Sequence, residues 1–398
     1  MSYATGQAVP WPVPPDWSSG VRERLAWRTE MLPARNGVTQ KREMRLAPRR
    51  EFDFKVIADA QARRVADALL FERGAQRWAL PIWHDVQLLG AALTAGGDTI
   101  ACSTAGFDFV VGGQAMLWRS VNVFEVVTIA TIGATSLTLA GTLASGWAAG
   151  TRLYPTRRAR NIEASEESAW NDDAGERRIS FAIDEPCDWT ATLPATTYRG
   201  YPVLEHRSDE GADPEASYQR EIESVDTGTG AVHYYDFPGV PFRRASHRWL
   251  LGSRAEHTAL RELLYGLRGR MAVLWVPSMS ADLSLASTIG ATSVSLSVEW
   301  AGYTLYGAQR SNRRDLRIEL RDGTVYYRRV TASAEAGVTE TLTLDSALGA
   351  EVTPQQLRLI SFMTLSEGGS DAVELDHVTD AAGITRAALS FQGVKHGF

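Results

Sequence analysis

The clearest candidate for acid–base chemistry is a neighbouring pair, His84 and Asp85, which follows an apolar segment ending at Trp83. A carboxylate beside an imidazole can orient the ring as a general base. The corresponding place in the second half of the chain, near Ser278 and Met279, has no histidine. The pair therefore has two interpretations: a role specific to one half or, as we expect, a polar pair at the end of a strand.

An acidic segment is the next candidate, because clustered carboxylates can supply the hard oxygen ligands that calcium prefers. It comprises residues 163–167 and 171–173, with the sequences EASEE and NDD. The segment lacks the alternating spacing and the central glycine of an EF-hand loop. We therefore expect a solvated loop there.

The other histidines and the cysteines do not suggest a metal centre. Cys102 and Cys187 are too few for a thiolate site or a disulfide framework. The remaining six histidines are scattered without ligand spacing: His206, His233, His247, His257, His377 and His396. The sequence thus predicts no metal site and no cofactor.

No compact catalytic signature is present. The chain contains no G-x-S-x-G elbow, no H-E-x-x-H, no G-x-x-x-x-G-K-[ST] loop and no C-x-x-C. Gly228 and Gly230 resemble the start of a dinucleotide fingerprint, but the third glycine is missing and the flanking residues favour a hairpin turn. We therefore expect a protein that is not an enzyme, without catalytic or cofactor-binding residues.

Composition bounds the class of protein that must position these residues. The chain has 398 residues, with 44% hydrophobic and 22% charged, which is typical of a globular protein of more than one domain. A net charge of -6 gives no general attraction to nucleic acid, so we expect no nucleic-acid partner. Residues 1–6 show no secretory signal, and two cysteines fit synthesis in a reducing cytoplasm.

One uncharged stretch, residues 126–150, is long enough to cross a bilayer. It consists largely of Thr, Ser, Gly and Ala with short alternating runs such as SLTL at 136–139. Such runs are typical of strands and turns. We therefore predict no membrane insertion.

The chain contains an internal duplication. A strand, a helix, a glycine and a Trp/Pro strand follow one another at 49–83 and again at 243–277. The two expected helices, 59–73 and 254–268, each carry a Leu-Leu-aromatic step before the glycine. Further matches are collinear: 97–103 with 291–297, 121–128 with 325–331, 134–139 with 338–344, and 180–181 with 390–391.

Each half is predicted to be mainly antiparallel sheet. Strand signals are short alternating runs bounded by Gly, Asp or Asn, and the clearest hairpin is 317–327, with Asp-Gly at its turn suggesting type I′. The predicted fold class is mainly β, with β-sandwich or split-barrel modules in tandem and one helix per half that covers an open face or edge.

The polar run 205–217 has almost no apolar residue, so we place a loose boundary there, between modules 1–205 and 206–398. The Pro/Trp-rich start favours an extended course. Trp11 and Trp17 on this arm are candidates for docking on a neighbouring subunit. An arm packed on its own module is the alternative.

Three segments carry a family resemblance: ERLAWRTE at 23–30, NGVTQKR at 36–42 and RLAPRREF at 45–52, with echoes at 218–220 and 263–270. They resemble tail proteins of long-tailed bacteriophages (siphophages) and of related gene transfer agents. The chain is most similar to the distal tail protein class, whose members form a ring between the tail tube and the receptor-binding apparatus. That class brings no catalytic residues, and two copies in one chain would let a trimer imitate the usual hexamer.

The expected function is thus a structural virion protein of a phage tail tip or baseplate, located in the tail after synthesis in the host cytoplasm. The resemblance implies a homo-oligomeric ring, trimeric or hexameric, whose partners are the tail tube, hub, tape measure and fibres.

Two other classes of function remain open. Twelve tryptophans would also suit a carbohydrate-binding or adhesion module at the tail tip. A cell-wall-degrading enzyme would need His84 or the acidic segment at its centre.

Overall fold

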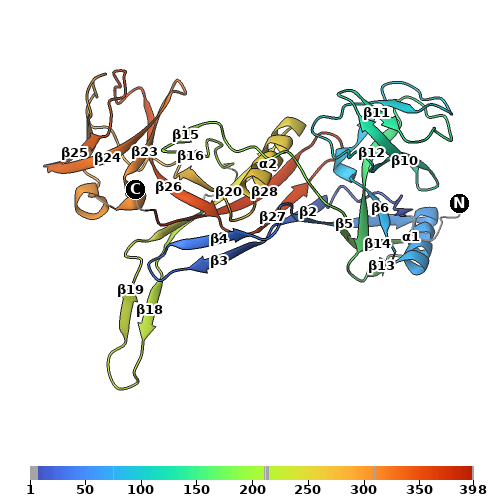
Figure 1. Ribbon diagram of the computed structural model, residues 1–398, viewed down its shortest axis with the longest axis horizontal. Coiled ribbons are helices and arrows are strands. Elements are labelled where there is room, and N and C mark those ends of the chain that lie inside the picture. The colour runs from blue at the N-terminus through green and yellow to red at the C-terminus, as the bar shows by residue number, and fades with distance from the viewer. Residues whose placement is uncertain (1–7, 75, 210, 212–214, 309, 397–398) are drawn as a thin grey trace.

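The computed structural model describes residues 8–74, 76–209, 211, 215–308 and 310–396. It is mainly β, with 46% of residues in strands and 10% in helices, as the alternating runs predict. The molecule is elongated, with most of the first half of the chain toward one end and most of the second half toward the other (Figure 1).

The first copy of the repeat begins with a short strand and a hairpin, continues through one helix, and ends in a small barrel and two returning strands. Its elements in chain order are β1 (Val9–Pro10), β2 (Val21–Ala26), β3 (Thr29–Pro33), β4 (Thr39–Glu43), β5 (Arg49–Asp59), α1 (Ala60–Arg73), β6 (Trp78–Pro81), η1 (Trp83–Asp85), β7 (Gln87–Leu88), β8 (Thr99–Ala101), β9 (Gln114–Ser120), β10 (Val123–Ile132), β11 (Ser136–Leu139), β12 (Arg152–Asn161), β13 (Glu167–Ala169) and β14 (Ala174–Ile183).

The second copy follows a small connecting hairpin, β15 (Thr197–Tyr198) and β16 (Tyr201–Pro202). Its elements are β17 (Ala216–Gln219), β18 (Ile222–Val225), β19 (His233–Asp236), β20 (Phe242–Leu251), α2 (Arg254–Leu267), β21 (Val273–Pro277), β22 (Ser295–Glu299), η2 (Tyr303–Gly307), η3 (Ser311–Arg313), β23 (Asp315–Leu320), β24 (Val325–Ala336), β25 (Thr339–Leu344), β26 (Leu357–Gly368), β27 (Ala372–His377) and β28 (Thr385–Gly393).

Strand pairing confirms the duplication. The pairs β2–β5, β5–β14, β13–β14, β6–β12, β9–β12, β9–β10, β10–β11 and β8–β11 recur as β17–β20, β20–β28, β27–β28, β21–β26, β23–β26, β23–β24, β24–β25 and β22–β25. Even the parallel pairing of β1 with β6 returns, as a bridge between Val203 and Trp275. The hairpins β3–β4 and β18–β19 occupy the same place in each copy, and β18–β19 projects farthest from the body (Figure 1).

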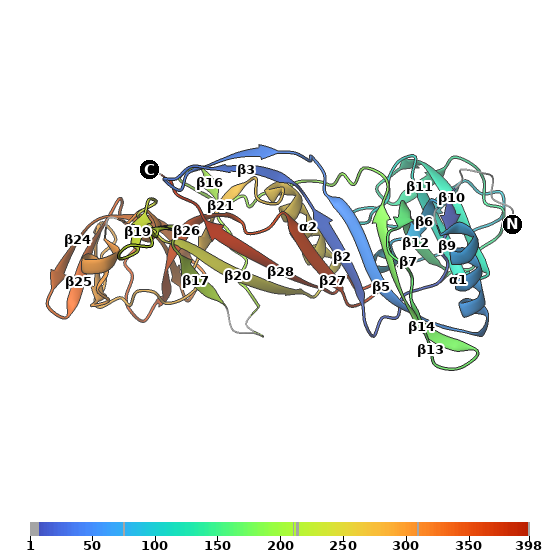
Figure 2. The ribbon, with the colours of Figure 1, turned by 90° about the horizontal axis from the view of Figure 1, so that it is seen from below.

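A single sheet runs through both copies, in the order β13-β14-β5-β2-β27-β28-β20-β17. Its central pair, β2–β27, joins the copies through six antiparallel positions, from Val21 opposite His377 to Ala26 opposite Ala372. The strands around this junction lie side by side in the middle of the molecule (Figure 2). The two copies are therefore fused through their backbones.

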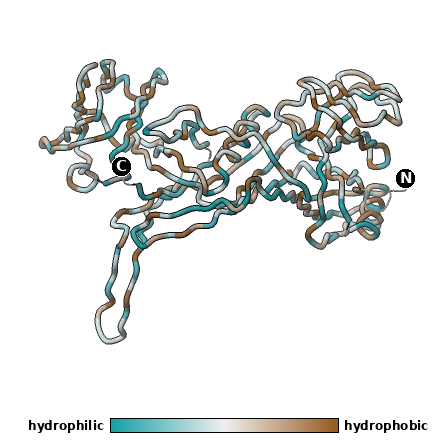
Figure 3. The backbone as a smooth tube through the Cα atoms, viewed as in Figure 1, coloured by the Kyte–Doolittle hydropathy of each residue, from teal (hydrophilic) through white to brown (hydrophobic). Residues whose placement is uncertain are grey.

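Each copy buries one apolar core under its helix-bearing sheet and one inside its small barrel, and the second copy holds a further small cluster around Trp275. Hydrophobic and hydrophilic residues alternate along the backbone (Figure 3). The helices differ in exposure. Only Ala66 of α1 is buried, whereas α2 buries six residues, among them His257, Leu264 and Tyr265. Both helices begin and end within one residue of the ranges predicted from sequence.

Two details differ from the sequence predictions. The hairpin at 317–327 forms, but its turn is a three-residue loop: Gly323 has a φ of 91° while Asp322 keeps a negative φ, so the type I′ assignment was wrong. The Gly323 amide donates to the Leu320 carbonyl at 3.1 Å, and the Leu320 amide donates to the Thr324 carbonyl at 2.9 Å.

The alignment of the first barrel strand was also wrong, by two residues. Ile100 pairs with Leu137 and Leu296 pairs with Leu342, so Ile100 corresponds to Leu296 and not to Val294. Ile100 and Leu296 are buried, whereas Val294 is 40% exposed. Burial in the barrel core determines which residues of the two strands correspond. The runs of Ala, Ser and Thr in the sequence do not show which position is buried.

The segment between the copies begins as an attached strand. Val203 and Leu204 are buried, and the Trp249 indole donates to the Arg207 carbonyl at 2.8 Å. The proposed boundary between 1–205 and 206–398 falls just after Val203, and residues 210 and 212–214 of the polar run lie outside the described residues. Residues 126–150 form strands and turns as expected, and no described helix is long and apolar enough to cross a membrane.

Candidate functional site at the junction of the two copies

The N-terminal arm packs on its own module. Trp11 is fully buried, with its ring 5.7 Å from those of Trp78 and Phe181. Trp17 is partly buried against the same core. The prediction that Trp11 docks on a neighbouring subunit is therefore wrong. Because β1 pairs with β6, the Trp11 indole is buried in the core of its own module. The alternative prediction, an arm packed on its own module, is confirmed.

Most tryptophans serve the interior of the protein. Among the described residues only Trp170 and Trp300 expose half or more of their surface, at 56% and 50%. The Trp300 indole donates to Glu335, and Trp170 follows β13 in the first copy. Little tryptophan surface is therefore left, among the described residues, on which a glycan could stack.

The acidic segment pairs with arginines. Glu167 contacts Arg63 at 2.6 Å and Arg177 at 2.6 Å, and Asp173 lies 3.3 Å from Arg64. These contacts tie β13 to α1 and β14. These two carboxylates are therefore engaged in surface ion pairs. The segment is exposed as expected, but the prediction of a loop was wrong for Glu167–Ala169, which form the strand β13 against β14.

The junction strand β2 carries a buried charge. The Glu23 side chain is fully buried between the two copies. Its Oε1 accepts a hydrogen bond from Arg50 Nε at 2.7 Å and lies 3.4 Å from Arg261. Burial alone would raise the pKa of Glu23, but the charges of Arg50 and Arg261 outweigh burial and hold this pKa well below its usual value. Glu23 is thus an ionised carboxylate inside the protein.

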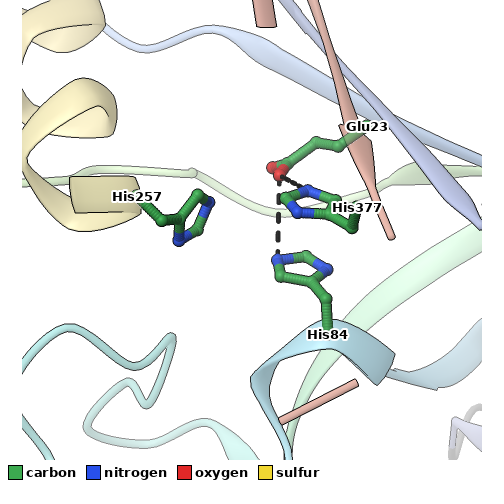
Figure 4. Close-up of side chains that lie close together, drawn as sticks. All are labelled: Glu23, His84, His257 and His377. Atoms are coloured by element: carbon green, nitrogen blue, oxygen red, sulfur yellow. Dashed lines mark hydrogen bonds and ion pairs between the residues drawn. The ribbon is translucent and has the colours of Figure 1, made fainter. Parts of the chain in front are cut away.

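Three histidines surround the other oxygen of this carboxylate (Figure 4). We call Glu23 and these rings the histidine cluster: Glu23 on β2, His84 on η1, His257 on α2 and His377 on β27. His377 Nε2 lies 2.9 Å and His84 Nε2 lies 3.9 Å from Glu23 Oε2. One potential ligand atom from each residue lies within 4.8 Å of all the others.

The rings of the histidine cluster are enclosed and poorly satisfied. His84 stacks on His377 with centroids 3.5 Å apart, and His257 stands edge-on to His377 at 5.2 Å. All three are at most 2% exposed. Within the part of the chain that the structure describes, neither ring nitrogen of His84 or of His257 has a hydrogen-bond partner. Burial, followed by the nearby His377, lowers the pKa of both rings well below the ordinary value, so both are neutral.

A network of arginines and carboxylates surrounds the cluster. Arg254 of α2 binds both the Asp85 carboxylate and the His84 carbonyl, across the junction. Asp108 accepts from Arg50 at 2.5 Å and also pairs with Arg157. His84 and Asp85 are at most 1% exposed, so a substrate cannot reach the imidazole and the pair does not have the geometry of an accessible general base.

Sequence reasoning missed the cluster because its members lie far apart in the chain and come from four different elements. The sequence singles out His84 and Asp85 because they are neighbours, whereas the spacing of His257 and His377 indicates no shared site. The available signal was positional: His257 lies on the buried face of α2, and His377 ends β27, the strand that pairs with β2.

The outer edges of the through-going sheet repeat the strands of the junction. Among the described residues β13 pairs only with β14 and β17 only with β20, and both strands are exposed throughout. By the pairing pattern β17 is the counterpart of β2, and β13 is the counterpart of β27. The molecule therefore ends in free copies of the two strands that it joins at its centre.

Comparison with known proteins identifies no relative. No protein-family model matches this sequence, and no curated protein matches it either. What the chain does must therefore be inferred from its duplicated sheet, its free edges and its buried cluster.

Proposed function

We propose that this chain is a non-enzymatic structural subunit that assembles head to tail into a ring, in the tail tip or baseplate of a long-tailed bacteriophage. In this role the ring joins the tail tube to the receptor-binding apparatus, and its partners are the tube, hub, tape measure and fibre proteins. The resemblance of residues 23–52 to phage tail proteins supports the place in the tail, and the duplicated sheet supports the ring.

The observation that carries the proposal is that the two free edges of the sheet are the counterparts of the two strands that pair at its centre. Inside the chain, β2 of the first copy pairs with β27 of the second. The counterparts of these strands, β17 and β13, lie at opposite ends of the sheet, and each has one edge without a partner strand among the described residues. Because β17 of one molecule can meet β13 of the next as β2 meets β27, one contact repeated head to tail would extend the sheet.

An exposed phenylalanine on the same end supports this contact. Tyr265 of α2 is 4% exposed and packs on Trp27 of the first copy at 5.5 Å. Its counterpart in α1 is Phe71, which is 94% exposed. The position that Tyr265 buries at the junction is therefore left uncovered in α1 and is available to a partner with the chemistry of the first copy. α1 and β13 lie together at one end of the molecule (Figures 1 and 2), so Phe71 belongs to the surface that the next molecule would cover.

Head-to-tail contacts have two outcomes, because a heterologous interface gives a ring when the rotation closes and a filament when it does not. In a closed assembly of three chains, six copies would surround the axis. Such a ring would match the six-fold symmetry that the distal tail protein class imposes on its neighbours, which is why a trimer is the leading form and a hexamer of chains the second.

A disulfide trap tests the contact at residue level. Carrying the β2–β27 register over to the free edges places Ser217 opposite Glu166 of the next molecule. A chain with both Ser217→Cys and Glu166→Cys is expected to form closed cross-linked oligomers on mild oxidation, seen as discrete bands on a non-reducing gel. Because the two residues occupy opposite ends of the sheet, only disulfides between molecules can form.

A variant that carries only one of the two substitutions, Ser217→Cys or Glu166→Cys, is the matched control and should give dimers at most. Negative-stain images of the trapped oligomer should show a ring with a central opening. A ladder without a closed species would indicate a filament, and the absence of cross-links in the double variant would remove the edge contact and with it the proposed assembly.

A further inference from the structure

The junction of the two copies holds a second feature, which does not depend on ring assembly. We propose that the histidine cluster is a structural metal site that binds one Zn²⁺ ion per chain, with one ligand atom from each of its four residues. Three imidazoles and a carboxylate are a ligand set suited to zinc, and a closed set of four without an open position is typical of structural sites.

The unpartnered nitrogens are the first argument. His84 and His257 are at most 2% exposed, and none of their four ring nitrogens has a hydrogen-bond partner among the described residues. Buried polar atoms in native proteins are nearly always satisfied, since leaving one unpaired costs about 1–3 kcal/mol. A metal ion bound at the centre of the cluster would satisfy one nitrogen of each ring.

The tautomer of His377 is the second argument. Its Nδ1 lies 3.0 Å from Thr385 Oγ1, and this hydroxyl also lies 3.3 Å from the Gly383 carbonyl, to which it can donate. A hydroxyl that donates to the carbonyl accepts from Nδ1–H, which leaves the Nε2 lone pair facing Glu23 Oε2 at 2.9 Å. In this tautomer a second proton or a metal ion between the two acceptors makes that approach favourable, whereas in the other tautomer Nε2–H itself donates to Glu23 and the Thr385 hydroxyl donates to Nδ1.

The outer contacts also resemble those of metal ligands. A hydrogen bond from the far nitrogen of a ligating histidine fixes its orientation, as Thr385 does for His377. Arg50 and Arg261 hold Glu23 Oε1 and leave Oε2 as the single ligand atom. The Asp85 carboxylate lies 3.6 Å from His84 Nε2 and adds a second negative charge beside the site.

The distances bracket what zinc requires. Tetrahedral coordination at about 2.0–2.1 Å places ligand atoms roughly 3.3 Å apart. The cluster has 2.9 Å and 3.9 Å between Glu23 Oε2 and two of the nitrogens, and no pair of its ligand atoms exceeds 4.8 Å. Metal binding requires the stacked rings of His84 and His377 to move apart. The His84 ring can move without breaking a hydrogen bond, because its nitrogens make none to the described residues.

The position of the site assigns its role. Glu23 and His84 belong to the first copy, and His257 and His377 belong to the second. The pairing register puts Ala216 in the place of Glu23 and Ala169 in the place of His377 at the free edges. The ion would therefore clamp the two copies of one chain to each other and would be absent from any contact between chains.

The test begins with the wild-type chain, purified, unfolded in denaturant with a chelator, and refolded with either zinc or the chelator. After dialysis, elemental analysis is expected to find one zinc per chain, and the zinc form should melt at a higher temperature than the chelated form. Refolding with Co²⁺ in place of zinc should give the visible absorption of a tetrahedral nitrogen–oxygen site. A folded wild type that keeps less than about a tenth of an equivalent, judged against the one-ion stoichiometry of a closed site, would overturn the proposal.

Variants locate the ion. His257→Gln should weaken zinc binding by more than about 100-fold, which is beyond the loss typical of an outer-sphere partner, and Thr385→Val should weaken it by about 10- to 100-fold while keeping all four ligands. His247→Gln is the matched control, since His247 is also buried but lies outside the cluster. Equal loss of zinc in the control and in His257→Gln would contradict the assignment. If His257→Gln does not fold, the Thr385→Val affinity and the cobalt spectrum decide.

Discussion

The buried carboxylate of Asp108 offers the sharpest test of the network that holds the junction. Asp108 is 2% exposed, and it accepts from Arg50 Nη1 at 2.5 Å and pairs with Arg157. Replacing it with asparagine changes the charge without opening a cavity. Removing one partner of a buried ion pair typically costs about 3–5 kcal/mol, because the remaining charge stays buried.

The expected cost lies at the lower end of this range. Arg50 keeps Glu23 at 2.7 Å, and Arg157 keeps Glu185 at 3.2 Å, so neither guanidinium loses its last carboxylate. We therefore expect Asp108→Asn to lower the free energy of unfolding by about 3 kcal/mol, roughly a hundredfold in the folding equilibrium. Urea unfolding followed by circular dichroism measures this loss in the first transition.

The pH dependence of the difference gives an independent check. Burial would raise the pKa of Asp108, but Arg50 and Arg157 outweigh it and hold the pKa well below its usual value. A carboxyl with a lowered folded pKa contributes stability that is full above the unfolded pKa of about 3.9 and is lost as the pH falls toward the folded pKa. The gap between wild type and variant should thus be constant from pH 8 to about pH 5 and shrink below about pH 4.

Asp53→Asn is the control, since Asp53 pairs with Arg178 on the exposed side of the sheet, where such pairs contribute about 0.2–1 kcal/mol. A loss in Asp108→Asn no larger than in this control, or a gap that widens in acid, would refute the role given to the buried network.

Four further predictions follow from single contacts. Trp11→Ala should destabilise the first copy by about 3–5 kcal/mol in urea unfolding, and deletion of the residues before Asp16 should do the same, because the arm is part of the core. Burial lowers the pKa of His247 to about 4, so this residue should cost the fold up to about 3 kcal/mol as the pH falls from 6.5 toward 4, because the unfolded chain binds a proton that the folded chain excludes. In a pH series of melts, His247→Phe should remove this share of the loss of stability. Ser253→Ala should cost about 1 kcal/mol in the same assay, since its side chain caps α2 by accepting from the Glu256 amide at 3.3 Å. Phe71→Ser should leave the melting temperature within a degree or two of wild type, as expected for an exposed residue, yet weaken self-association in light scattering.

Much of the fold could be predicted from sequence because it depends on local patterns. Both helices, the Trp/Pro strands and the hairpin at 317–327 follow from periodicity and turn residues, and the order of these signals reveals the duplication. Burial was harder to predict. The sequence of the polyproline-like arm suggests an exposed segment. In the structure β1 pairs with β6 and Trp11 is buried, and this burial depends on the complete sheet.

The histidine cluster could not be predicted from the sequence for a related reason. Glu23 and His377 are 354 positions apart, and they meet because β2 pairs with β27 across the copies. A duplicated chain allows each copy to pair within itself or with its neighbour, and local residue patterns do not distinguish these arrangements. Because β2 and β27 pair with each other, their counterparts β17 and β13 each keep one free edge among the described residues. The cluster and the free edges therefore have the same topological cause.

The most direct test of head-to-tail assembly is the particle mass of the purified chain in solution, measured by light scattering over a range of concentrations. The account predicts a closed species of three times the 43.6 kDa of one chain, or of six times. This species should dissociate when Ala216→Pro removes an N–H group that faces the free β17 edge, since the neighbouring Glu215 and Ser217 direct theirs toward β20. A chain that stays monomeric at every concentration, or an oligomer unchanged by Ala216→Pro, would contradict it.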